Sequence, residues 1–135
     1  MSQSSTQSTL QAYAPTILSL VRIVAGLIFL AHGTQKLLGF PALPPDREIP
    51  VFGLMWFGGI LEAFGGLLIV IGLFTRPVAF ILSGQMAVAY FMFHAPKSFF
   101  PALNGGDAAI LYCFLFLYFV FAGPGSISVD AARKR

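Results

Sequence analysis

The sequence predicts an all-α fold, an integral membrane bundle of four helices. Hydrophobic residues make up 57% of the 135-residue chain and charged residues only 10%, whereas a soluble domain carries about 25% charged residues. Four apolar stretches alternate with segments rich in proline, glycine and charge. One of them, residues 51–74, is long enough as a helix of ~1.5 Å rise per residue to cross a hydrocarbon core of ~30 Å. We therefore expect the lipid bilayer to surround this chain.

The chain divides into three parts by composition. Residues 1–11 are polar and uncharged and predict a flexible tail, whereas residues 126–135 end in three basic residues and predict a cytoplasmic tail. The membrane domain lies between these tails, over residues 12–125. Its four spans are expected at about residues 15–38, 51–74, 77–93 and 108–122.

The first expected span carries its polar groups on one side. The helical spacing i, i+4, i+7, i+11 and i+14 defines a face formed by Arg22, Gly26, Phe29, Gly33 and Lys36, with His32 on an adjacent face. Arg22 lies deeper than Lys36, which favours pairing inside the bundle over snorkelling. For Lys36, near the outer end, snorkelling of the ammonium group to the interface is the simpler interpretation and interior pairing is the alternative.

Glu62 is the one ionisable residue of the second span and lies close to its middle. An isolated carboxylate at that depth costs at least ~2.5 kcal/mol, so Glu62 should have a partner or a proton. Gly58, Gly65 and Gly66 share its side of the helix, and small residues let another helix approach closely. We expect Glu62 to face the bundle interior and to pair with Arg22, directly or through one water. A protonated acid that serves a ligand is the alternative.

The third and fourth spans add further polar groups. Gln85, near the centre of the third span, is expected to hydrogen-bond to another helix, either as a structural contact or near a ligand. Thr75 and Asp107 are expected to cap the third and fourth spans. The candidate polar or ligand-binding side chains are Arg22, His32, Lys36, Glu62, Gln85, Tyr112 and Tyr118, and no catalytic residue is assigned among them.

Two proline-rich loops, residues 39–50 and 94–106, are expected at the membrane end opposite the termini. Trp56 is expected to anchor at the interface near the first loop. The candidates for an interfacial lid are Trp56 and, in the second loop, Phe99 and Phe100. We expect an apolar pocket that opens toward the outer half of the bilayer and is lined by His32, Trp56 and aromatic residues of the fourth span.

Charge and cysteine content exclude several classes of function. The net charge is +3, but the basic residues are scattered or gathered near the C-terminus, which indicates membrane orientation and not nucleic-acid binding. The positive-inside rule places both termini in the cytoplasm. The single cysteine, Cys113, excludes an intrachain disulfide, a CxxC pair and a cysteine-held cluster. His32 and His94 lie at different expected depths, so no metal or haem site is expected.

Three segments together resemble the DoxX family over almost the whole chain after the N-terminal tail. They are RIVAGLIFLAHGTQKLLGF in the first span, GGILEAFGGLLIVIGLFTRP from the second span into the turn, and GPGSISVD after the fourth span. The resemblance implies a multi-pass protein of a bacterial or archaeal inner membrane, linked to redox systems. The sequence has no flavin, haem, iron–sulfur or nicotinamide motif. No covalently bound cofactor is therefore expected, and the resemblance suggests a quinone or another apolar molecule as ligand and a redox subunit as partner.

Three functions stay open at this point. They are a membrane subunit of a redox or quinone-linked system that binds an apolar ligand within the bundle, a non-catalytic anchor or assembly partner of another protein, and a small-solute carrier. If the chain is part of an enzyme, the first function makes it a membrane subunit of a quinone-linked oxidoreductase. A copurified quinone would favour the first, a stoichiometric partner without ligand the second, and uptake by the pure protein in liposomes the third.

Overall fold

The structure, a computed structural model, describes residues 2–134, and within them the secondary structure is entirely helical. This confirms the predicted all-α fold. In chain order the elements are α1 (Ser2–Leu38), α2 (Leu54–Ile71), α3 (Thr75–Ala89), the π-helix η1 (Tyr90–His94), the 3₁₀-helix η2 (Ala95–Lys97), α4 (Pro101–Asn104), α5 (Asp107–Ala122) and α6 (Val129–Arg133).

Four of these helices are apolar and form the membrane bundle. Three are long and apolar enough to cross a membrane: Ser4–Leu38 within α1, all of α2, and the stretch from Thr75 to Lys97. The fourth, α5, is equally apolar but has 16 residues, or about 24 Å at the usual helical rise. Side chains such as Phe80, Phe91 and Phe121 point outward and are exposed in the isolated chain, as lipid-facing residues are in a bilayer.

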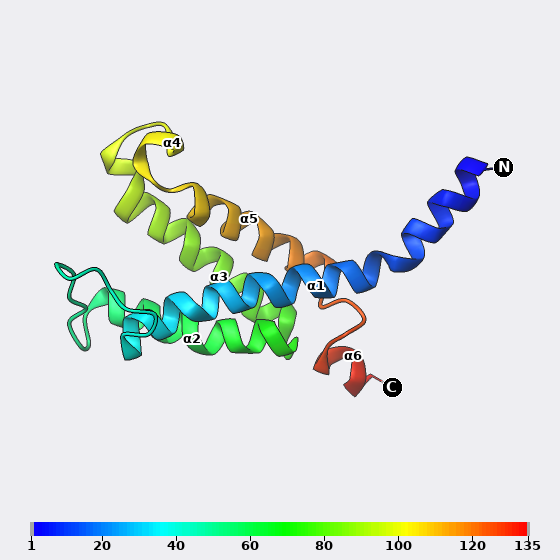
Figure 1. The fold of residues 1–135 in the computed structure, drawn as a ribbon, viewed down its shortest axis with the longest axis horizontal. Coiled ribbons are helices and arrows are strands. Elements are labelled where there is room, and N and C mark those ends of the chain that lie inside the picture. The colour runs from blue at the N-terminus through cyan, green and yellow to red at the C-terminus, as the bar shows by residue number, and fades with distance from the viewer. Residues whose placement is uncertain (1, 135) are drawn as a thin grey trace.

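The bundle consists of two helix pairs (Figure 1). Helix α1 packs along α2, and α3 packs along α5, whereas the two pairs meet mainly through α2 and α3. The pairs lie close at the end that holds both chain termini and diverge toward the end that holds the two long loops (Figure 1). We call these ends the terminal face and the loop face; the loop face comprises residues 39–53 and 95–106.

Glycines make the α1–α2 contact possible. A Cβ atom on Gly33 would lie 2.7 Å from the Cα of Ala63, and one on Gly66 would lie 2.8 Å from the amide nitrogen of Leu30. These neighbours are backbone atoms that cannot move aside. Close backbone approach through small residues drives helix association in lipid, where apolar side chains gain little from leaving their solvent.

The α3–α5 pair is held by packing and by one buried hydroxyl. Ser83 donates a hydrogen bond of 2.7 Å from Oγ to the carbonyl oxygen of Cys113. The fully buried core includes Phe29, Phe116 and Phe119, and the Phe29 and Phe116 rings meet edge to face with centroids 5.0 Å apart. The core therefore lies toward the terminal face, where the two pairs converge.

The terminal face is closed by the segment after α5, residues 123–130, which we call the C-terminal clasp. Arg22 is 1% exposed and donates hydrogen bonds to the carbonyl oxygens of Ile127 at 2.7 Å and of Pro124. It also donates to the carbonyl oxygens of Ile69 at 2.8 Å and Val70 at 3.3 Å in α2. One guanidinium thus joins α1, α2 and the clasp through backbone oxygens.

Asp130 of the clasp caps α3. Its carboxylate accepts hydrogen bonds of 2.9 Å from the backbone amides of Phe74 and Thr75. Partial burial acts to raise the pKa of Asp130, but the two amides and the charge of Arg133 outweigh it and lower the pKa overall. The carboxylate therefore stays ionised at the positive end of the α3 dipole.

Three local predictions differ from the structure. Residues Ser2 to Gln11 continue α1 as helix and do not form an irregular tail. Thr75 does not cap α3, because Phe74 occupies the cap position and Asp130 supplies the acceptor. Asp107 lies inside the first turn of α5, after Gly106 at the cap position, and its side chain makes no capping hydrogen bond.

Candidate ligand cavity

A cavity of about 730 Å³ lies where the two helix pairs diverge. Its lining comes from α1, α2, α3 and α5, from η1 and η2, and from the loop between α1 and α2. Phe29 and Tyr112 contribute aromatic surface, with ring centroids 5.2 Å apart. Both the volume and the mainly apolar lining are typical of small-molecule sites.

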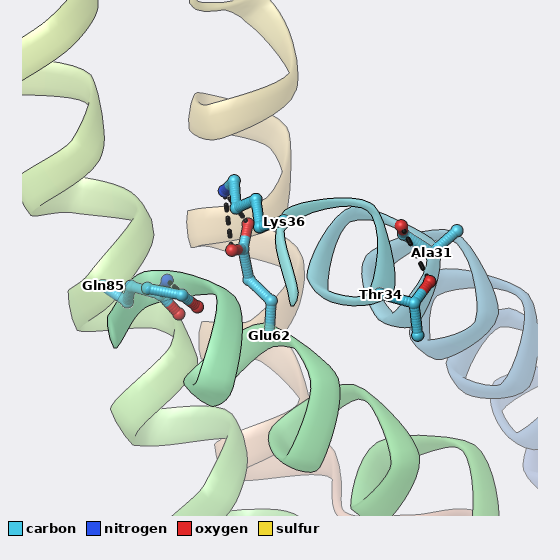
Figure 2. Close-up of polar contacts among 6 residues, drawn as sticks. Ala31, Thr34, Lys36, Glu62 and Gln85 are labelled. Atoms are coloured by element: carbon cyan, nitrogen blue, oxygen red, sulfur yellow. Dashed lines mark hydrogen bonds and ion pairs between the residues drawn. The ribbon is translucent and has the colours of Figure 1, made fainter. Parts of the chain in front are cut away.

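An ion pair lies in this cavity (Figure 2). Lys36 Nζ is 2.6 Å from Oε2 and 2.8 Å from Oε1 of Glu62, so the ammonium group is shared by both carboxylate oxygens. Glu62 is 4% exposed, and the side chain of Lys36 is 18% exposed. Each charge removes the desolvation problem of the other, and the more exposed lysine is the member that a ligand can reach.

The predicted pairing of Glu62 with Arg22 is wrong, although the interior position of Glu62 is correct. Arg22 lies 14 residues before Lys36, about 21 Å along α1, and donates its hydrogen bonds to four backbone carbonyls and to Ser19 Oγ near the terminal face. Snorkelling of Lys36, the simpler prediction, is likewise wrong. The ammonium group turns inward because Glu62 on the neighbouring helix lies at its own depth.

Gln85, on α3, lines the cavity next to Glu62 (Figure 2): a Cβ atom on Gly58 would lie 3.4 Å from its Nε2 and 3.9 Å from Oε2 of Glu62. Its Nε2 donates a hydrogen bond of 3.2 Å to the carbonyl oxygen of Gly58 on α2, which confirms the predicted inter-helix contact. Its Oε1 is buried and has no hydrogen-bond partner in the part of the chain that the structure describes. A buried carbonyl oxygen without a donor carries an unmet hydrogen-bonding capacity beside the cavity.

The other predicted site residues divide into two groups. His32 and Tyr112 line the cavity. Tyr118 is 59% exposed and, with Trp56, lies outside the lining; the Trp56 ring packs against Phe52 instead, with centroids 5.0 Å apart. The other proposed lid residues also lie outside the lining, and they are exposed: Phe99 by 87% and Phe100 by 60%.

Sequence reasoning missed two contributors to the cavity. Gly84 on α3 lines it, and a Cβ atom at this position would meet no atom within 4 Å, so the glycine leaves open space. The π-helix η1 contributes Met92, Phe93 and His94, and π-helical turns occur often at functional sites. No sequence signal distinguishes Gly84 from the contact glycines, or a π-turn from the end of an α-helix.

His94 is oriented by the second loop. Its Nδ1 is 3.1 Å from the carbonyl oxygen of Asn104, whose buried side chain donates to Tyr90 Oη and to the carbonyl oxygen of Ser98. Within residues 2–134, no three histidine, cysteine, aspartate or glutamate side chains come together in a way that could hold a metal ion. The cavity therefore combines the Lys36–Glu62 ion pair, the Gln85 amide and two histidines with a mainly apolar lining, to which the charged residues Arg47, Glu48 and Lys97 also belong.

Comparisons with known proteins agree with this architecture. The DoxX family model matches residues 17–95, more than half of the chain. An uncharacterized protein of Haemophilus influenzae is 43% identical over 91% of this chain and 95% of its own length. The uncharacterized membrane protein Rv3486 of Mycobacterium tuberculosis is 26% identical over 90% of this chain and 83% of its own length. The inner membrane protein YphA of Escherichia coli is 26% identical over 88% of this chain and 91% of its own length. No solved structure matches the chain.

Proposed function

Because this chain belongs to the DoxX family of membrane proteins, we propose that it is an inner-membrane component of a redox system and binds a quinone or a similar apolar ligand. The observation that carries the proposal is the cavity between the α1–α2 and α3–α5 pairs, which combines an apolar lining with the Lys36–Glu62 ion pair. An apolar ligand with one polar ring needs this combination.

The lining also matches the chemistry of such a ligand. Several cavity residues of α2 and α3, among them Leu61, Ile81 and Val88, are also exposed on the outer surface of the bundle. The cavity is therefore open to lipid between these helices, and a ligand dissolved in the bilayer has a direct route into it. Tyr112, which lines the cavity and is only partly buried, offers a face against which a flat ring can pack.

Lys36 and Gln85 would orient the polar ring. The Lys36 ammonium group has three donors and can give one to a carbonyl oxygen while it keeps Glu62 neutralised. The Gln85 Oε1, which lacks a donor among the described residues, would accept from a ring hydroxyl after a small rotation of the amide. As part of an enzyme, the protein would be the quinone-binding subunit of an oxidoreductase, and a partner redox subunit would deliver the electrons.

The test is photolabelling with an azido-quinone in nanodiscs that contain the purified protein. We expect label on peptides that line the cavity, and we expect Gly84→Leu to abolish it, because a Cβ atom at this position meets nothing within 4 Å and the longer side chain would occupy the cavity. Leu111→Phe is the matched control: Leu111 is 69% exposed on α5 and lies outside the lining. Equal labelling of all three proteins, or label spread over lipid-facing peptides, would contradict the proposal.

A second candidate function, a membrane anchor for another protein, is favoured by the length of α1. Its 37 residues span about 55 Å, well beyond a hydrocarbon core of ~30 Å, and residues 4–15 are exposed along their whole length. This projection would give a partner a rigid place to bind. Affinity purification from gently solubilised membranes, with and without residues 2–12, tests it: a stoichiometric partner that is lost on truncation would support the anchor.

A further inference from the structure

The cavity reaches the polar surface at one end of the bundle. Arg47 and Glu48 from the first long loop, and His94 and Lys97 from the second, belong to its lining. Arg47, Glu48 and Lys97 are exposed, so the mouth of the cavity is wetted at the loop face. Water and hydrophilic groups can therefore approach the Lys36–Glu62 pair from this side.

The other end of the cavity is blocked by packed side chains. Phe29 and Met86 form part of its lining and are themselves buried. Beyond them, toward the terminal face, the core residues Ile69, Leu82, Phe116 and Phe119 have exposed fractions of 0–1%. The Phe116 ring contacts Phe119, with centroids 6.2 Å apart, as well as Phe29. An apolar layer of this kind leaves no path for water or ions.

The C-terminal clasp forms a second barrier beneath this layer. Arg22 joins it to α1 and α2, and Ser19 Oγ accepts a hydrogen bond of 2.9 Å from the amide of Ile127 while it donates one of 3.1 Å to Pro124. Ser19 and Arg22 are both buried. The clasp therefore covers the terminal face of the bundle and is held there by hydrogen bonds to α1 and α2.

From these three observations we infer that protons, water and other polar reactants exchange with the cavity from the loop face alone. A partner or soluble reactant that serves the Lys36–Glu62 site must then work at the loop face, while the apolar ligand arrives from the bilayer. One-sided exchange also argues against a carrier, which must expose its site to both faces in turn. The identity of the ligand rests on the proposed function; the sidedness does not.

The test is cysteine accessibility with a charged, membrane-impermeant thiosulfonate reagent. In a Cys113→Ala background, Gly84→Cys reports on the cavity, and Pro45→Cys and Lys134→Cys mark the loop and terminal faces. Phe80→Cys on the same helix is the lipid-facing control, exposed but outside the lining. Right-side-out and inverted vesicles are each treated, and folding of every variant is verified by its elution as a single species in detergent.

In vesicles whose loop face is exposed to the reagent, where Pro45→Cys reacts, we expect Gly84→Cys to be modified. In vesicles of the opposite orientation, where only Lys134→Cys reacts, we expect no modification of Gly84→Cys. Reaction from the terminal face, or a rate from the loop face no higher than that of Phe80→Cys, would overturn the inference. The outcome is independent of the quinone assay. Failure of photolabelling with loop-face modification intact would reject the proposed ligand and leave one-sided exchange standing.

Discussion

Lys36 and Glu62 show how two costly side chains become tolerable inside a bilayer. Each lies on a different helix, and their contact at 2.6 Å places the positive charge against both carboxylate oxygens. Removal of one partner from a buried pair leaves the other charge without compensation, which typically costs ~3–5 kcal/mol. Substitution of one member of the pair should therefore cost more stability than substitution of both members together.

We predict strong energetic coupling between these two residues. Lys36→Met and Glu62→Gln should each destabilise the protein by about 3–5 kcal/mol, and the double variant should lose clearly less than their sum. The measurement is a double-mutant cycle on the unfolding free energy in detergent. The matched control pairs Glu62→Gln with Arg22→Met, which share no contact, and should be additive within about 0.5 kcal/mol. Coupling in the control cycle and none in the first would reinstate the Arg22 pairing.

At this scale the sequence identified the right residue and the wrong partner. The glycines around Glu62 indicated which side of α2 faces the bundle, because that depends only on the helical period. The partner depends on the relative depth of two helices, which the intervening loop sets. Residues 39–53 hold four prolines, and the sequence gives no measure of how far such a loop reaches.

The α1–α2 contact illustrates the element scale, because three glycines on these helices, Gly26, Gly33 and Gly66, face backbone atoms of the other helix. At Gly33 a methyl group would lie 2.7 Å from the Cα of Ala63, whereas at Gly84 it would meet nothing within 4 Å. The same substitution should therefore have opposite effects on stability at the two positions.

We predict that Gly33→Ala destabilises the bundle by at least about 1–3 kcal/mol, the usual cost of overpacking, since α1 and α2 must move apart. Gly84→Ala should leave stability unchanged or raise it by up to about 1 kcal/mol, because alanine is the better helix former. Thermal unfolding of the two variants beside the parent protein measures both. A stable Gly33→Ala variant with an intact Lys36–Glu62 coupling would contradict the close approach.

The existence and type of the long helices were predictable, since hydrophobic length decides them, but several ends were not. The start of α3 depends on Asp130, 55 residues further along the chain, so no local pattern reveals it. Residues Ser2–Gln11 carry no apolar face, yet they continue the helix from the span that follows them. Helix propagation adds residues to an existing helix more readily than it nucleates one, which a polar composition does not disclose.

At the scale of the whole molecule, the Lys36–Glu62 ion pair changes which charged residues remain at each face of the bundle. Glu62 neutralises Lys36 inside the bundle, whereas Arg22 donates to neutral carbonyl oxygens and keeps its charge near the terminal face. The loop face then keeps Arg47 and Lys97, with Asp46 and Glu48 beside them. Among the described residues, the terminal face keeps Arg22, Arg76, Arg133 and Lys134, with Asp130 beside them. The positive-inside rule applied to this distribution favours cytoplasmic termini.

We predict that Pro45→Cys, in the Cys113→Ala background, reacts with an impermeant maleimide added to intact cells, and that Lys134→Cys reacts only after the cells are broken. Both positions are exposed in the structure, so a lack of reaction reports the membrane and not burial. The reverse labelling pattern would place the termini outside.

The cavity was only partly foreseeable. Sequence reasoning placed His32 and an aromatic residue of the fourth span in it, because polar groups on apolar helices turn toward one another. It could not anticipate that the two helix pairs diverge, which depends on how all four helices cross. The divergence explains why Gly84 lines open space while Gly33 and Gly66 are pressed against backbone.

The ion pair also constrains biogenesis. If α1 entered the bilayer alone, it would carry the unpaired ammonium group of Lys36 in its half near the loop face, and α2 alone would carry the bare carboxylate of Glu62. Because the contact neutralises both groups, we expect α1 and α2 to insert together as a helical hairpin, in contact at Gly26, Gly33 and Gly66. The α3–α5 pair, whose spans contain no such charge in their middle, can partition afterwards and dock onto a finished half.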